Sequence, residues 1–156
     1  MRWPTLKFVD VLEVMHPYFS EYFGNASSDH KYGKTAKTDS EKSREQVSAI
    51  INRNPKEVIF TSGVTEAINL AIKGYVEANP SKGNHIITVK TEHKAVLSTC
   101  EYLETKGYEV TYLDVDENGL IDLTQLENSI KKNTILICVM HVMYYSNGRG
   151  YGSILL

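Results

Sequence analysis

The feature that most constrains the fold is an alternation, from about residue 57 onward, of short apolar runs with longer amphipathic stretches. Four apolar runs are predicted strands: Glu57–Phe60, His85–Val89, Glu109–Leu113 and Thr134–Val142. Their length and content of β-branched residues are typical of strands. The last run is almost continuously apolar, which predicts a strand buried on both faces.

The stretches between these runs have the spacing of helices. We predict helices over Thr65–Asn79 and Thr91–Lys106, and a short one that begins at Asp122. Strand and helix in alternation predict an α/β fold with a mainly parallel sheet of about four strands and flanking helices. The earlier part of the chain differs: we expect only helices there, from Asp10 to about His16 and over Lys34–Asn52.

In parallel sheets, ligands bind beyond the carboxyl ends of the strands. The segment Thr61–Glu66 (TSGVTE) follows one predicted strand and opens a helix. The free N–H groups of a helix N-terminus attract anions such as phosphate, and Ser62 and Thr65 add hydroxyl donors. The same residues suit a helix cap, with Gly63 at the cap and Glu66 complementing the helix dipole. Sequence pattern alone favours the cap.

His93 follows the next predicted strand, where an imidazole can stack on a flat ring or move protons. The alternative is a surface histidine in a charged turn. Glu92 and Lys94 are expected to be solvated. Cys100 and Cys138 are expected to be inert packing residues. The five histidines show no metal-ligand spacing, so no metal site is predicted.

Composition narrows the class of protein. Hydrophobic residues make up 42% and charged residues 23% of 156 residues, which argues for a folded domain. A net charge of −2 gives little electrostatic support for binding nucleic acid or a membrane surface. The segment 1–10 lacks the apolar stretch of a signal peptide and no run is long enough to span a bilayer, so we expect a cytoplasmic protein.

Five ordered motifs together resemble the cysteine desulfurases, enzymes of the class-V aminotransferase group that depend on pyridoxal phosphate (PLP). They are FGNASSDHKYG (Phe23–Gly33), FTSGVTEAINLAIKG (Phe60–Gly74), KTEHKAVLSTC (Lys90–Cys100), NGLIDL (Asn118–Leu123) and TILICVMHV (Thr134–Val142). The TEHKAV form is similar to the iron–sulfur-cluster branch of the family. Several motifs in order are far more specific than any single one.

The resemblance implies part of the large domain of a PLP-dependent transferase with the aspartate aminotransferase-like fold (fold type I). It implies that Thr65 binds the PLP phosphate with the backbone of Val64, and that His93 stacks on the pyridine ring and assists proton transfer as a catalytic residue. The family acts as a homodimer that takes sulfur from L-cysteine, leaving alanine and a protein persulfide. That sulfur then passes to an iron–sulfur scaffold protein.

The chain departs from the family at both ends of the resemblance. Residues 1–10 do not match, 11–142 resemble the PLP-binding large domain, and 143–156 form a non-matching tail expected to be irregular. Tyr144 stands where the family has an asparagine that contacts the PLP ring oxygen. The Schiff-base lysine, the aspartate that pairs with the pyridine nitrogen and the persulfide cysteine have no counterpart in these 156 residues.

These departures leave three readings open. The chain is the PLP-binding part of a cysteine desulfurase, inactive by itself; or a non-enzymatic relic that binds a full-length homologue or a scaffold protein; or a small phosphate-ligand binder that uses only Thr61–Glu66. A sheet of about four strands, where the family has about seven, leaves edges unpaired and apolar faces uncovered. We therefore also expect marginal stability or self-association.

Overall fold

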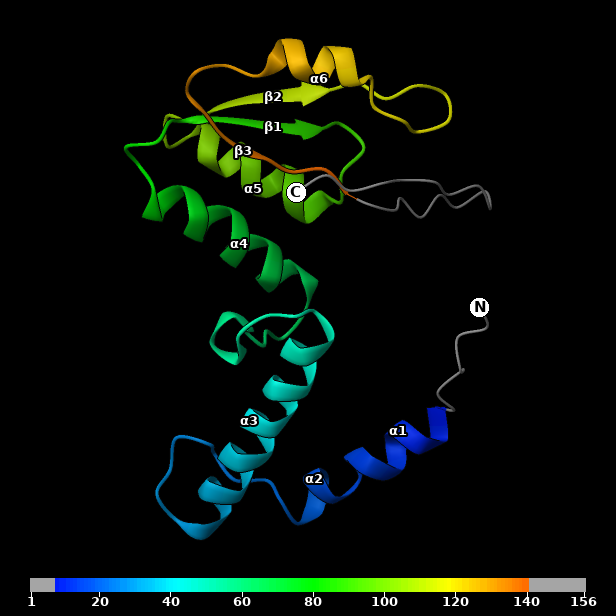
Figure 1. Ribbon diagram of the computed structural model, residues 1–156, viewed down its shortest axis with the longest axis vertical. Helices are drawn as coiled ribbons and strands as arrows, with labels where there is room; N and C mark the ends of the chain where they lie inside the picture. Colours follow the sequence, from blue (N-terminus) through cyan, green and yellow to red (C-terminus); the bar gives the residue numbers. More distant parts are fainter. Residues whose placement is uncertain (1–7, 141–156) are drawn as a thin grey trace. The chain divides into compact units, whose positions relative to one another are not determined.

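A computed structural model describes residues 8–140 (Figure 1). The chain divides into two compact units, with the boundary between Phe60 and Thr61, and each is described by itself. The expectations for residues 1–7 and for the tail 143–156 lie outside the described residues. The boundaries 11–142 of the expected PLP-binding domain remain a prediction.

The first unit is helical. Its elements are α1 (Phe8–Met15), α2 (Pro17–Ser20), α3 (Lys31–Ile50) and the short 3-10 helix η1 (Pro55–Glu57). The two predicted helices are confirmed, with α1 and α3 each beginning two or three residues earlier than the pattern indicated. His16 and Pro17 separate α1 from α2. The imidazole of His30 caps α3 by accepting a hydrogen bond from the amide of Gly33 at 3.2 Å.

The close packing of the backbone before α3 requires glycine at two positions of the motif Phe23–Gly33. A Cβ atom on Gly24 would lie 2.2 Å from the carbonyl oxygen of Tyr32, and one on Gly33 would lie 2.2 Å from that of Ser28. The backbone therefore approaches too closely for any side chain at these two positions. This loop is held by Asn25, whose side chain accepts from the amide of Ser27.

The predicted strand Glu57–Phe60 is wrong. Pro55 to Glu57 form η1, which Asn54 and Glu57 close with a capping box, and residues 58–60 have no regular structure. A strand needs a neighbouring backbone to pair with. Here the carbonyl of Val58 instead accepts a hydrogen bond from the guanidinium of Arg44.

The second unit is an α/β layer structure. It contains α4 (Val64–Ala78), β1 (His85–Val89), α5 (Lys94–Glu104), β2 (Glu109–Leu113), α6 (Leu123–Ser129) and β3 (Thr134–Ile137). The three strands are parallel and lie in the order β2-β1-β3. The α/β class and the parallel sheet are confirmed, with three strands among the described residues rather than about four.

Alternate side chains of β1 build the cores on both faces of the sheet. Ile86 packs with apolar side chains of α4 and α5 on one face, whereas Ile87 and Val89 pack with Leu113 and with Leu126 of α6 on the other. In Figure 1, α5 and α6 lie on opposite sides of the strands. All five residues of β1 are buried.

The prediction that the last strand is buried on both faces is wrong for its described part. Every residue of β3 is only half-buried. The reason is the strand order: among residues 8–140, β1 is the central strand, and β3 pairs with β1 along one side only. Sequence hydrophobicity identified the strand but not its place in the sheet.

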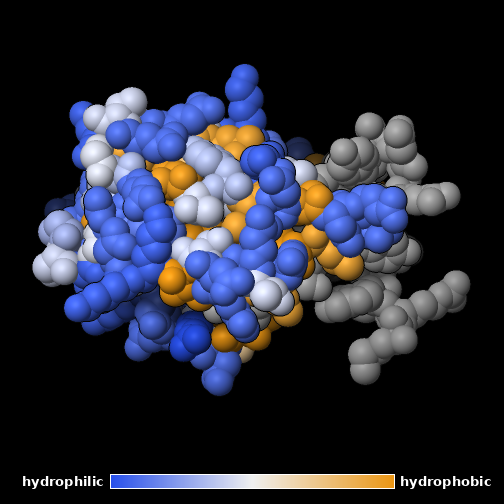
Figure 2. All heavy atoms as spheres, turned by 90° about the horizontal axis from the view of Figure 1, so that it is seen from above, coloured by the Kyte–Doolittle hydropathy of each residue, from blue (hydrophilic) through white to orange (hydrophobic). Residues whose placement is uncertain are grey.

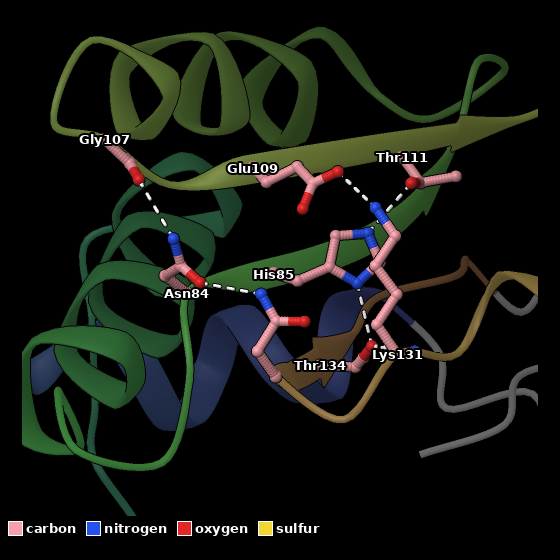
Figure 3. A network of polar contacts seen from close by, with 8 residues as sticks. Asn84, His85, Gly107, Glu109, Thr111, Lys131 and Thr134 are labelled. Atoms are coloured by element: carbon pink, nitrogen blue, oxygen red, sulfur yellow. Dashed lines mark hydrogen bonds and ion pairs between the residues drawn. The ribbon is translucent and has the colours of Figure 1, made fainter.

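A buried histidine joins all three strands (Figure 3). His85 of β1 lies 2.8 Å from Thr111 Oγ1 of β2 and 2.8 Å from Thr134 Oγ1 of β3 through its two ring nitrogens. The Thr134 hydroxyl oxygen also accepts a hydrogen bond from the amide of Lys131. In the neutral ring one of these nitrogens donates and the other accepts, and a threonine hydroxyl can take either role.

Apolar side chains also reach the surface, as Figure 2 shows for one face. About half of each of three apolar side chains around α6 is exposed: Leu120, Leu123 and Ile130. Val14 of α1 is 70% exposed. The expectation of uncovered apolar surface is thus confirmed for the described residues. No helix within residues 8–140 is long and apolar enough to cross a membrane.

The glycine motif gives a stability prediction. Gly33→Ala should lower the free energy of unfolding by about 1–3 kcal/mol, because the added carbon overlaps the Ser28 carbonyl. Gly74→Ala is the matched control: no atom lies within 4 Å of its Cβ position in α4, so it should stabilise by about 0.5–1 kcal/mol. Thermal unfolding followed by circular dichroism measures both, and equal effects would contradict the close approach.

The His85 network gives a pH prediction. Burial, together with the charge of Lys131, lowers the pKa of His85 below 6.5, although Glu109 opposes the shift. The folded state therefore binds fewer protons than the unfolded state, and stability should fall as the pH drops below 6.5 toward the folded-state value. In His85→Gln this fall should be absent. Urea denaturation at several pH values tests it, and identical pH profiles for the two proteins would refute the assignment.

Candidate functional site

The segment Thr61–Glu66 forms the start of α4, as the sequence indicated. Gly63 is the N-cap residue, and no side chain caps the helix at this position. The carboxylate of Glu66 accepts hydrogen bonds from both the amide and the hydroxyl of Ser62, each at 2.6 Å. These two contacts lower the pKa of Glu66.

Gly63 at the N-cap agrees with the cap interpretation of this segment, whereas the anion site remains a prediction. Ser62 is used by Glu66, so its hydroxyl is not a free donor for a phosphate. Val64 and Thr65 are exposed in the first turn of α4, where backbone N–H groups have no partner within the helix. No atom lies within 4 Å of the Cβ position of Gly63, so this helix end is sterically open.

His93 forms the N-cap of α5. Its Nδ1 accepts a hydrogen bond from the amide of Ala95 at 3.1 Å, and its carbonyl accepts from the amide of Val96 at 2.8 Å. A ring nitrogen that accepts carries no proton, so the proton of the neutral ring is on Nε2. The ring is exposed and thus presents Nε2 and its faces to a ligand.

The structure brings Thr65 and His93 together in one groove. This open depression, of about 420 Å³, lies between α4 and α5. It is lined by Thr65, Asn69, Lys73, His93, Lys94, Ala95, Ser98 and Thr99. The sequence motifs did not point to Asn69 and Lys73, although they follow Thr65 by four and eight residues and so lie on the same helix face. Lys73 Nζ lies 4.3 Å from the centroid of the Tyr102 ring, which holds it over α5.

The expectation that Glu92 is solvated is wrong. Only 8% of Glu92 is exposed. Its carboxylate accepts a hydrogen bond from the amide of Met140, which follows β3. Burial raises the pKa of Glu92, while hydrogen bonds from the amides of Met140 and His93 act in the opposite direction. Sequence gave no sign of this contact, because the partner is a backbone group distant in the chain.

The two lysines beside His93 have different surroundings. Lys90 forms an exposed ion pair with Asp114, with Nζ 2.8 Å from Oδ1. Lys94 lines the groove.

Asp116, after β2, closes the following turn by accepting hydrogen bonds from the amides of Asn118 and Leu120. The positions after β2 are therefore used by the fold.

Both cysteines are packing residues, as expected. Cys100 is fully buried in the core between α5 and the sheet, and Cys138 packs against the same core. Burial raises the pKa of Cys100 to about 12 and that of Cys138 to about 11, so neither thiol is poised to ionise. Among residues 8–140, no three His, Cys, Asp or Glu side chains gather as a metal site would require. Tyr144 and His141 lie outside the described residues.

Comparison with known proteins identifies the family. The sequence profile of Aminotransferase class-V matches residues 3–150. The chain belongs to the class-V aminotransferase family. The resemblance to cysteine desulfurases is confirmed: the cysteine desulfurase IscS of Neisseria gonorrhoeae is 56% identical over 133 residues, and that of Ehrlichia chaffeensis is 54% identical over 132.

Solved structures of the class-V family share the fold. A NifS-like protein superposes with a TM-score of 0.79 at 39% identity, over 85% of this chain and 36% of that one. SspA in complex with cysteine gives a TM-score of 0.77 at 41% identity, over 85% and 38%. The matched region is 85% of this chain and 33% of the Neisseria protein, so the chain spans about a third of the length of the curated relatives it matches.

The residues of the groove fit the phosphate and ring of PLP, on which this family depends. A phosphate fits the open N-terminus of α4, where the amides of Val64 and Thr65 and the Thr65 hydroxyl are exposed. A flat ring fits the exposed imidazole of His93, which lines the same groove. The carboxylate of Glu66 accepts its hydrogen bonds from Ser62, so it does not occupy the amides of Val64 and Thr65.

The capping role of His93 can be separated from any ligand role. His93→Ala should lower the free energy of unfolding by about 0.5–2 kcal/mol, because the amide of Ala95 loses its acceptor. His93→Asn should restore most of this loss, since asparagine is a good N-cap residue. Thermal unfolding of the three proteins measures the effect. Equal stability of His93→Ala and the wild type would show that the cap contributes nothing.

Proposed function

We propose that this chain forms the part of a cysteine desulfurase that holds the phosphate and one face of the ring of PLP. The observation that carries the proposal is the shared groove, which unites Thr65 at the start of α4 with His93 at the start of α5. Each was singled out from the sequence separately, and 27 residues of chain separate them.

In this proposal, the residues divide the work of binding. The amides of Val64 and Thr65 and the Thr65 hydroxyl bind the phosphate, where the positive end of the α4 dipole favours an anion. The ring of His93 stacks on the pyridine, with its orientation set by the bond from Ala95, and its Nε2 is the atom that can hold or release a proton. PLP, when bound, supplies an electron sink.

The wider activity is a proposal as well. By its relatives, the reaction is sulfur removal from L-cysteine, with a homodimer and an iron–sulfur scaffold protein as partners and a cytoplasmic location. The lysine that carries PLP and the cysteine that receives sulfur in the family have no counterpart in these 156 residues. We therefore propose that a polypeptide of these residues alone binds the cofactor without turning over L-cysteine.

One observation favours the alternative of an interaction fragment. Val9 and Val14 of α1 are 58% and 70% exposed, and Phe19 of α2 is 73% exposed. Several exposed apolar side chains within one segment are typical of surfaces that bind a partner. A full-length homologue or a scaffold protein would be the partner in that case, and cofactor binding would not be required.

Binding of PLP to the 156-residue chain tests the proposed function. Equilibrium dialysis should show that PLP binds and that pyridoxal, which lacks the phosphate, binds much more weakly. Thr65→Val should weaken PLP binding by about tenfold, because a hydrogen bond to a charged group is lost. Thr124→Val in α6 is the matched control and should bind like the wild type.

The same experiment includes the stable His93→Asn variant. Its cap is retained but its ring is gone, so weaker PLP binding would report the stacking contact. Equal binding of PLP and pyridoxal, or of wild type and Thr65→Val, would reject the phosphate site. Binding of a full-length homologue without any binding of PLP would instead favour the interaction fragment.

A further inference from the structure

A buried carboxylate lies next to the exposed imidazole of the groove. Glu92 is 8% exposed, whereas His93, the next residue, is exposed. Glutamate is almost never buried without partners, because removing its charge from water is unfavourable. The position of Glu92 therefore depends on the groups that meet its carboxylate.

Those groups belong to two separate parts of the chain. The amide of Met140, 48 residues along the sequence, donates to Oε1 of Glu92. The amide of His93 lies near enough to the carboxylate to lower the pKa of Glu92. The amide of Glu92 itself donates to the carbonyl of Val89, the last residue of β1, at 3.3 Å. Glu92 thus links the end of β1, the His93 turn and the chain that leaves β3.

The capping contacts of His93 do not fix the position of its turn relative to the sheet. The bonds from Ala95, Val96 and Leu97 fix His93 relative to α5, because all three donors are in the first turn of that helix. The contact between Glu92 and Met140 instead fixes the turn relative to the sheet. On the β2 side, the turn is held by the amide of Lys90, which donates to the carbonyl of Leu113 at 3.0 Å.

We propose that Glu92 is a positioning residue, whose buried carboxylate anchors the His93 turn to the chain after β3 and so fixes the imidazole for contact with PLP. The proposal rests on the proposed function, because it concerns how His93 is presented to that ligand. Glu92 itself lines no part of the groove and is not a catalytic residue.

The amides that meet Glu92 provide a direct readout of this geometry. The titratable neighbours of the carboxylate are the imidazole of His93 and the thiols of Cys100 and Cys138. An amide that donates to a carboxylate changes its proton chemical shift when the carboxylate is protonated. In the wild-type chain, nuclear magnetic resonance should therefore show the Met140 and His93 amides titrating together, with a midpoint above the ordinary 4.5 of glutamate.

Mutants test whether Glu92 acts through His93. Glu92→Gln keeps one oxygen acceptor but removes the charge and the second acceptor, and it should weaken PLP binding by about threefold to tenfold, the range for one hydrogen bond. Glu101→Gln on the exposed face of α5 is the matched control and should bind like the wild type. In the His93→Asn background, Glu92→Gln should have no further effect, because residues that act together are not additive.

The outcomes separate this proposal from the proposed function. Additive losses in the double mutant, or PLP binding by Glu92→Gln at wild-type strength while His93→Asn is weakened, would overturn the role of Glu92 alone. Failure of the wild-type chain to bind PLP would overturn the proposed function. Should Glu92→Gln not fold, the wild-type amide titration still decides: separate midpoints for Met140 and His93, or none above 4.5, would overturn the anchor.

Discussion

The second unit of this chain depends on the burial of one five-residue strand, β1. Its backbone pairs with β2 and β3, and its side chains alternate between two cores. Burial of apolar area on both faces is the main favourable contribution that such a small sheet can have. The polar members of β1 are placed accordingly: His85 finds a threonine on each neighbouring strand, so its burial leaves neither ring nitrogen unpaired.

The candidate site lies where β1 ends. The chain turns after Val89, passes through Glu92 and caps α5 with His93. On the same face of the sheet, α4 packs beside α5, which brings Thr65 into the groove. Groups that a ligand would contact are exposed, whereas Glu92, which we propose positions His93, is buried. A rigid strand end thus supports an open binding surface, an arrangement that suits recognition of a ligand by a preformed site.

Local structure was predictable because its causes are local. The bounds of β1 and β2 match the apolar runs, and α4 matches its spacing within one residue at each end. The cap of α4 and the exposed position of Thr65 followed from residue types at a helix start. The errors concerned neighbours within residues 8–140. The stretch 57–60 has the composition of a strand but pairs with no other strand there, and β3 has the composition of a central strand but pairs with β1 alone.

The sequence by itself determined the family, the α/β class, the elements of the second unit and the three residues proposed to bind PLP. Only the tertiary structure decided that Thr65 and His93 share one groove, that Ser62 is engaged by Glu66, and that Glu92 is buried against the amide of Met140. The physical reason is that a motif records which side chains are present, whereas burial and hydrogen bonding depend on backbone groups brought together from distant parts of the chain.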